Sequence, residues 1–160
     1  FWVVPTPNGF LTLDEIPEAC HLWLLATGTA IGPFLSILKT AAPWSRFEKV
    51  VLGYSVRTRD ELSYQDTIQE IRRRPPAQFQ FVPFITREPC DGHLCQRIPA
   101  SIESGALELK TGLELTPKLA HVMLCGNSSM LQDTLASLEK RGMKRHRRRE
   151  PGHVSMEKYH

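Results

Sequence analysis

The sequence has no apolar run that approaches the roughly 20 residues needed to cross a bilayer. It opens with FWVVPTPNGF, which has neither an initiator methionine nor the basic segment of a secretory signal peptide. These absences argue against a transmembrane segment and a signal peptide, and the missing methionine indicates a fragment of a longer protein. Internal repeats are also absent. The 160 residues are enough for one well-formed core.

Cysteine is sparse, and no two cysteines form a C-x-x-C pair. The four are Cys20, Cys90, Cys95 and Cys125. Cys90 and Cys95, with His93 between them, offer part of a metal site, but a second ligand pair is missing. We therefore expect no bound metal and four reduced thiols, as is usual in the cytoplasm.

What is present is a regular alternation of short apolar runs with helical segments. Continuous apolar runs of this length are typical of strands buried on both faces of a parallel sheet. Helix-length segments between them imply right-handed crossovers. The sequence predicts strands at 21–27, 49–56, 79–85, 121–126 and 153–159, with helices at 32–41, 61–74, 97–105 and 128–142. The predicted fold is a doubly wound, Rossmann-like α/β domain with helices on both faces of the sheet, spanning residues 21–160. Residues 1–20, rich in proline and turn residues, read as a closing strand and a linker.

The stretch ATGTAIGP joins the first strand to the first helix, although it is not G-x-G-x-x-G. Gly28 can take a positive φ, and Gly32 allows close approach of a ligand. Thr27 and Thr29 add hydroxyl groups beneath the start of a helix whose N–H groups favour anions. The loop therefore suits a diphosphate, while the alternative is an ordinary structural turn.

Arginines recur at the ends of the next strands. Arg57 and Arg59 follow the second strand, whereas Arg87 and Arg97 follow the third. In nucleotide-binding folds an arginine after the second strand accommodates the 2′-phosphate of NADP. Guanidinium groups match phosphate oxygens bidentately. Surface arginines without a ligand are the alternative.

Cys125 and Gly126 close the fourth predicted strand. Two small residues there leave room for a flat ring, although a buried cysteine usually serves only as a small core residue.

The segment RGMKRHRRRE, residues 141–150, holds six Lys or Arg residues and a His. Such a run indicates an acidic protein partner or nucleic acid, or else a solvated helix end. The aromatic pattern expected of single-strand binding is missing, so we do not expect nucleic acid.

Five stretches, in order along the chain, carry a family resemblance: LWLLATGTAIGPFLSIL, LSYQD, RIPASIESG, VMLCGN and HRRREPGHVSMEKYH. Together they resemble bacterial ferredoxin–NADP reductases, also called flavodoxin–NADP reductases. That family implies an N-terminal barrel that holds FAD and a C-terminal NADP(H) domain. This sequence resembles the second alone, because the flavin-binding R-x-Y-S motif does not occur in it. Residues 1–20 then match the end of the barrel and the linker, and the FAD-binding domain is missing from the chain.

The resemblance implies a role for each matching residue. Thr27, Gly28, Thr29 and Gly32 would lie near the nicotinamide and diphosphate. Arg57, Arg87 and Arg97 would bind the 2′-phosphate, with Tyr64 near the adenosine. Cys125, next to Gly126, matches the cysteine beside the nicotinamide, and Glu157 matches the carboxylate that influences proton and charge balance at the flavin. Tyr159 matches the aromatic residue near the flavin ring, and His160 stands where many members have tryptophan.

The implied activity is hydride transfer from NADPH to FAD, followed by transfer of single electrons to ferredoxin or flavodoxin. The basic residues Lys144, Arg145, Arg147, Arg148 and Arg149 would then help to steer an acidic partner or neutralise FAD phosphates. The alternative is an isolated, non-catalytic NADP-binding domain without flavin. We expect a cytoplasmic protein without a membrane partner.

Overall fold

The computed structural model describes residues 16–62, 64–73, 78–89, 93–147 and 149–158. In this part of the chain, five strands form one parallel sheet in the order β3-β2-β1-β4-β5. The strands are β1 (His21–Thr27), β2 (Lys49–Val56), β3 (Phe79–Ile85), β4 (Ala120–Gly126) and β5 (Val154–Lys158). The predicted doubly wound α/β fold is confirmed.

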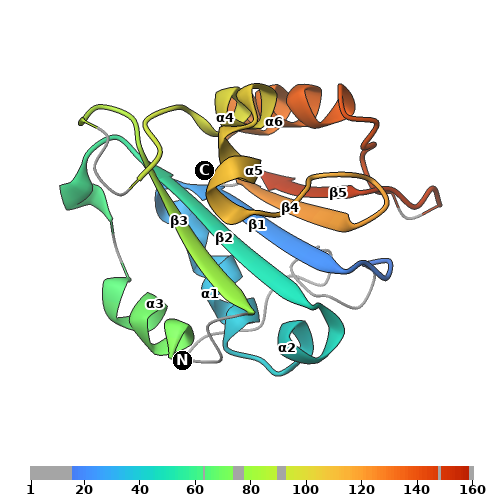
Figure 1. The fold of residues 1–160 in the computed structure, drawn as a ribbon, viewed down its shortest axis with the longest axis horizontal. Coiled ribbons are helices and arrows are strands. Elements are labelled where there is room, and N and C mark those ends of the chain that lie inside the picture. The colour runs from blue at the N-terminus through green and yellow to red at the C-terminus, as the bar shows by residue number, and fades with distance from the viewer. Residues whose placement is uncertain (1–15, 63, 74–77, 90–92, 148, 159–160) are drawn as a thin grey trace.

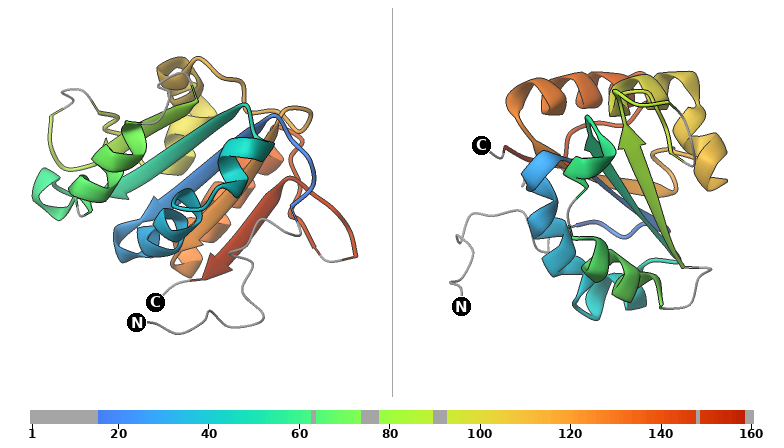
Figure 2. Two further views of the ribbon diagram at one scale, coloured as in Figure 1. Left: turned by 90° about the horizontal axis from the view of Figure 1, so that it is seen from below. Right: turned by 90° about the vertical axis from the view of Figure 1, so that its left-hand side faces the viewer.

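Helices cover both faces of the sheet (Figures 1 and 2). One face carries α1 (Gly32–Leu38), α2 (Ala42–Arg46) and α3 (Gln65–Arg72); the other carries α4 (Ile98–Ser104), α5 (Ala106–Thr111) and α6 (Ser128–Glu139). Crossovers therefore change face after β3, and the chain returns to the centre of the sheet to place β4 beside β1. In such sheets, the point where β1 and β4 diverge is the usual ligand site.

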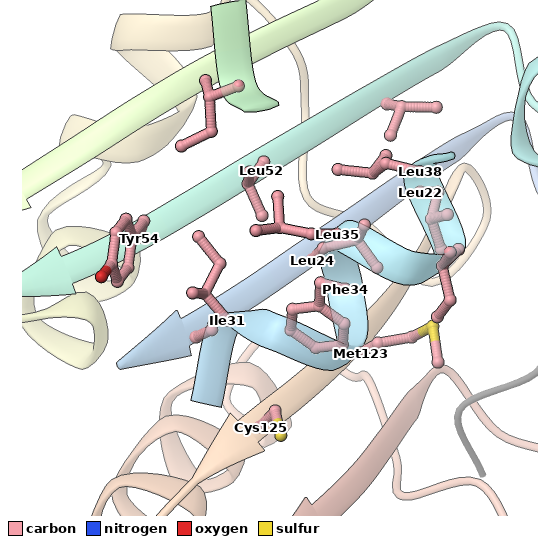
Figure 3. Close-up of a cluster of buried hydrophobic side chains, with 14 of the residues drawn as sticks. Leu22, Leu24, Ile31, Phe34, Leu35, Leu38, Leu52, Tyr54, Met123 and Cys125 are labelled. Carbon is pink, nitrogen blue, oxygen red and sulfur yellow. The ribbon is translucent and has the colours of Figure 1, made fainter. Parts of the chain in front are cut away.

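Two apolar clusters hold the layers together, one on each face. Alternate residues along the strands point to opposite faces. Leu22, Leu24 and Leu52 therefore face α1, where Phe34 and Leu38 pack on them (Figure 3). Burying a leucine or phenylalanine side chain contributes about 1.5–3 kcal/mol. The second cluster joins Trp23, Val122 and neighbouring strand residues to α4, α5 and α6.

The strand predictions agree with the structure within a few residues, whereas the helices differ more. The loop expected at 28–31 is a 3₁₀ turn, η1 (Gly28–Ile31), in which Gly28 has the predicted positive φ of 55°. The helix expected at 61–74 begins only at Gln65, because Tyr64 adopts a left-handed conformation with φ 64°. α6 is capped by Asn127, whose side chain accepts a hydrogen bond from Met130 N.

Pro83 fits the edge position of its strand, because a proline cannot donate to a sheet ladder. β3 lies at the edge of the sheet, and the loop residue Leu94 pairs along its outer side. Leu94 N donates to Pro83 O, and Ile85 N donates to Leu94 O. The loop that follows β3 is thereby fastened against the strand.

The prediction of four reduced thiols is wrong for Cys95, which is disulfide-bonded. Cys20 and Cys125 are free thiols. Among the described residues, no group of three His, Cys, Asp or Glu side chains could hold a metal ion. None of the helices in the described ranges is long and apolar enough to cross a membrane.

Candidate nucleotide-binding site

A cavity of about 1040 Å³ opens at the carboxyl edge of the sheet. The ends of four strands supply its walls, because the carboxyl ends of parallel strands meet at one edge. The lining residues are Thr27, Gly28, Ala30, Tyr54, Ser55, Val56, Arg57, Glu61, Thr86, Arg87, Cys95, Arg97, Gly126 and Asn127. Pockets for small molecules and cofactors typically measure about 300–1,000 Å³, so the cavity is large enough for a dinucleotide.

Six of the residues predicted from the sequence line this one cavity: Thr27, Gly28, Arg57, Arg87, Arg97 and Gly126. The backbone ties two of them together, since Arg87 N donates to Arg57 O over 2.9 Å. Parallel pairing of β2 with β3 produces this contact directly beyond the strand ends. The loops carrying the two arginines are therefore held side by side.

The cavity is strongly cationic. Within the described part of the chain, the structure gives no hydrogen bond or ion pair to the guanidinium groups of Arg87 or Arg97. Arg57 donates to Glu61 Oε2 over 3.1 Å. Arginine side chains without carboxylate partners, gathered in one cavity, form a site suited to a phosphorylated ligand.

Gly126 lines the cavity and has no room for a side chain of its own. A Cβ added there would lie 2.8 Å from Thr27 Oγ1 and 2.9 Å from Met130 Sδ. The site therefore admits no larger residue without movement. Gly32, by contrast, has open space around it and does not line the cavity.

Cys125 lies beside Gly126 but is fully buried in the cluster under α1 (Figure 3). Burial, together with the negative charge of Glu157, raises the pKa of the thiol to about 12. Glu157 is its register partner on β5. The thiol is therefore neutral at physiological pH and has no nucleophilic character there.

Two other predicted residues lie away from the lining residues. Tyr64 is exposed on the loop that leads into α3, and Glu157 is half-buried on β5. The backbone of Thr29 belongs to η1. Tyr159 and His160 lie outside the described residues.

Tyr54 and Glu61 are among the lining residues that were not predicted from the sequence, although the sequence carries a signal for Glu61. Tyr54 is buried, and its hydroxyl donates to the backbone oxygen of Glu61 over 3.4 Å. Glu61 belongs to a capping box with Thr58, around the 3₁₀ turn η2 (Arg59–Glu61). The spacing T-x-x-E is visible in the sequence and marks such a turn.

The basic run divides into two parts. Arg141 is structural: it pairs with Glu108 at 2.7 Å and donates to Ile102 O at 2.6 Å. Lys144, Arg145, Arg147 and Arg149 are exposed. They belong to the segment that joins α6 to β5, whose residues pair with one another through Arg147 and Glu150.

A doubly wound sheet with a cationic cavity at its switch point defines the class of nucleotide-binding α/β domains. Comparison with known proteins narrows this class. The sequence matches the family model of the oxidoreductase NAD-binding domain over residues 24–136. The chain belongs to that family.

Relatives include the flavodoxin/ferredoxin–NADP reductase of Escherichia coli, 46% identical over 132 residues, which cover 82% of this chain and 53% of the relative. The ferredoxin–NADP reductase of Pseudomonas aeruginosa is 34% identical, with 95% and 62% covered. A crystal structure of a ferredoxin NADP⁺ reductase from Neisseria gonorrhoeae, with bound FAD and NADP, superposes with a TM-score of 0.87 at 36% identity, covering 94% of this chain and 61% of that one. The chain thus spans about half the length of the first curated relatives.

Proposed function

We propose that this chain is the NADP(H)-binding part of a ferredoxin/flavodoxin–NADP reductase. The observation that carries the proposal is the meeting of Arg57, Arg87 and Arg97, from separate loops, at one cavity. Two of these guanidinium groups have no partner within the described residues. A group with two negative charges, such as a 2′-phosphate, fits this arrangement, whereas the 2′-hydroxyl of NAD does not require it.

The rest of the cavity suits the other end of a dinucleotide. Thr27 and Gly28 leave β1 beside Gly126 and Asn127, which leave β4. Small residues and backbone N–H groups at this point suit a diphosphate and a flat nicotinamide ring. Bound NADPH supplies a hydride, and the chain's own residues bind, orient and shield it. Cys125, small and neutral, would support the backbone behind the ring.

The partners follow from the same proposal. The relatives are named for flavodoxin and ferredoxin, and we propose one of these as the electron acceptor, with FAD held by a domain outside this chain. Lys144, Arg145, Arg147 and Arg149 offer exposed positive charge for an acidic partner. Glu157, Tyr159 and His160 would contribute at the flavin. The cytoplasmic location expected from the sequence stays a prediction.

Replacement of Arg97 by Ala tests the proposal. Loss of one charge-assisted hydrogen bond costs about 1.5–3 kcal/mol, which is roughly a tenfold to hundredfold weaker affinity for NADP⁺. The affinity for NAD⁺, which lacks the 2′-phosphate, should change little. Isothermal titration of the wild type and Arg97→Ala with both dinucleotides measures the difference. Arg145→Ala, an exposed arginine outside the cavity, is the matched control. Equal weakening of both dinucleotides, or no binding by the wild type, would contradict the proposal.

A further inference from the structure

The cationic cavity contains one carboxylate, that of Glu61, among its lining residues. We propose that Glu61 is a positioning residue: by holding Arg57, it sets the preference of the cavity for the 2′-phosphorylated dinucleotide. The inference rests on the proposed function and extends it to a residue that binds no ligand itself.

The two carboxylate oxygens of Glu61 have different partners. Oε1 accepts hydrogen bonds from two backbone amides, Arg57 N at 3.0 Å and Thr58 N at 3.1 Å. Oε2 accepts one from Arg57 Nη2 at 3.1 Å. One carboxylate therefore fixes both the turn that follows β2 and the side chain that leaves it. The same hydrogen bonds keep the pKa of Glu61 below its usual value, with that from the Arg57 side chain contributing most, so the group is ionised at neutral pH.

This hydrogen bond orients the Arg57 side chain and occupies one of its N–H donors. A guanidinium group has five N–H donors in a planar fork, and Glu61 takes one donor from Nη2. The other donors are left for a ligand. The Arg57 side chain is 63% exposed, so without its partner it would sample many rotamers and lose them on binding. Fixing a long side chain in advance lowers the entropic cost of association.

Buried contacts in turn fix Glu61. Its backbone oxygen accepts the hydroxyl hydrogen of Tyr54, which is 2% exposed and lies on β2. The Thr58 side chain completes the capping box around η2. The backbone of Glu61 is therefore fixed by its neighbours on β2 and in the turn.

A second carboxylate nearby provides a matched control. Glu88, on the loop after β3, accepts a hydrogen bond from Arg59 N at 2.8 Å and pairs with Arg59 Nε at 3.8 Å. It fastens the same turn from the other side, but it neither lines the cavity nor contacts the Arg57 side chain. Neutralising Glu88 removes one negative charge near the site and leaves Arg57 held.

The experiment compares Glu61→Gln with Glu88→Gln by isothermal titration with NADP⁺ and NAD⁺. The carbonyl oxygen of the introduced glutamine can still accept from the backbone amides, but its NH₂ group faces Arg57 Nη2, donor against donor. We expect Glu61→Gln to weaken NADP⁺ binding by about threefold to tenfold, the effect of one hydrogen bond, and to leave NAD⁺ unchanged. Glu88→Gln should leave NADP⁺ binding unchanged or strengthen it, because a repulsive charge is lost. If Glu61→Gln binds NADP⁺ as tightly as the wild type or more tightly, the carboxylate only opposes the phosphate, and the inference is overturned.

A double-mutant cycle separates positioning from a merely structural role. In an Arg57→Ala background, Glu61→Gln should cause no further loss of NADP⁺ affinity, because the side chain it holds is gone. The same loss in both backgrounds would overturn the inference. Unchanged NAD⁺ binding shows that each variant is folded. A wild type that does not prefer NADP⁺ would contradict the proposed function itself, whereas normal preference in both wild type and Glu61→Gln would contradict this inference alone.

Discussion

At the scale of single residues, the site depends on backbone positions as much as on charged groups. Gly126 is the clearest case, because the space that a Cβ would need is occupied by Thr27 Oγ1 and Met130 Sδ. Thr27 sits at the end of a central strand and cannot move far, whereas the Met130 side chain is flexible. The closeness of these two atoms is a property of the packed sheet.

We expect Gly126→Ala to lower the free energy of unfolding by about 1–3 kcal/mol, the usual cost of overpacking. It should also weaken NADP⁺ binding, since the added methyl group displaces Thr27 at the cavity wall. Urea denaturation and titration measure the two effects. Gly32→Ala is the control, because its Cβ meets nothing within 4 Å and no overpacking is expected there. A Gly126→Ala variant as stable as Gly32→Ala would contradict the steric argument.

The sequence predicts the placement of residues that follow strand ends, but not of residues whose position depends on side-chain contacts. Arg57, Arg87 and Arg97 each follow a strand, and parallel strands bring such positions to one edge. Tyr54 lies within a strand, where alternation alone does not distinguish a core residue from a lining one. The partners of Glu61 depend on η2, a turn shorter than hydrophobic periodicity can detect.

At the scale of elements, the pairing of β4 with β5 contains a buried polar contact. His121 Nε2 lies 2.8 Å from Ser155 Oγ, and His121 is 2% exposed. Burial lowers the pKa of His121 to about 3, and the nearby His146, His153 and Arg46 act in the same direction. The ring of His146 stands edge-on to it, with centroids 5.8 Å apart.

This shift makes stability depend on pH. Because the folded pKa lies below the ordinary 6.5, the unfolded chain binds a proton that the folded chain does not. The contribution of His121 is complete above pH 6.5 and is lost progressively between pH 6.5 and about 3. Between pH 7.5 and 5 the loss is about 2 kcal/mol, at 1.36 kcal/mol per unit below 6.5.

Urea denaturation of His121→Gln at the two pH values measures this contribution. The variant should lose about 2 kcal/mol less than the wild type over this interval. His153→Gln, which removes a half-buried histidine of the same region, should change the slope less. An identical slope for wild type and His121→Gln would show that the histidine takes up its proton equally in the folded and unfolded states, which would contradict the lowered pKa.

The predicted and observed bounds of the strands and helices show which features local sequence patterns predict and which they do not. Strands were predicted well because buried parallel strands form continuous apolar runs. The first helix was expected to continue to residue 41, but it ends at Leu38 and α2 follows as a separate short helix. The helix end predicted at Gly105 is confirmed, because Gly105, with φ 85°, separates α4 from α5. The break after Leu38, in contrast, depends on how the helices fit the sheet, which propensity does not encode.

At the scale of the whole molecule, binding and catalysis are separable. The chain spans about half of the first curated relatives, and the proposed hydride acceptor is a flavin held outside it. The 160-residue chain should therefore bind NADPH without oxidising it. Absorbance at about 340 nm, followed with an artificial electron acceptor present, measures oxidation of the nicotinamide, and titration measures binding. Steady oxidation by a colourless, flavin-free sample would show that this chain alone is catalytic.

The strands that line the cavity are synthesised at different times, and this order decides when the cavity can form. Its lining residues run from Thr27 to Asn127, and β4 must insert beside β1, about a hundred residues earlier in the chain. When β1, β2 and β3 of a nascent chain have left the ribosome, the loops that carry Arg57 and Arg87 are present. The part of the cavity wall that β4 supplies, with Gly126 and Asn127, is still missing. Under the proposed function, we expect dinucleotide affinity to arise late in synthesis, once the fourth strand has left the ribosome and paired with β1.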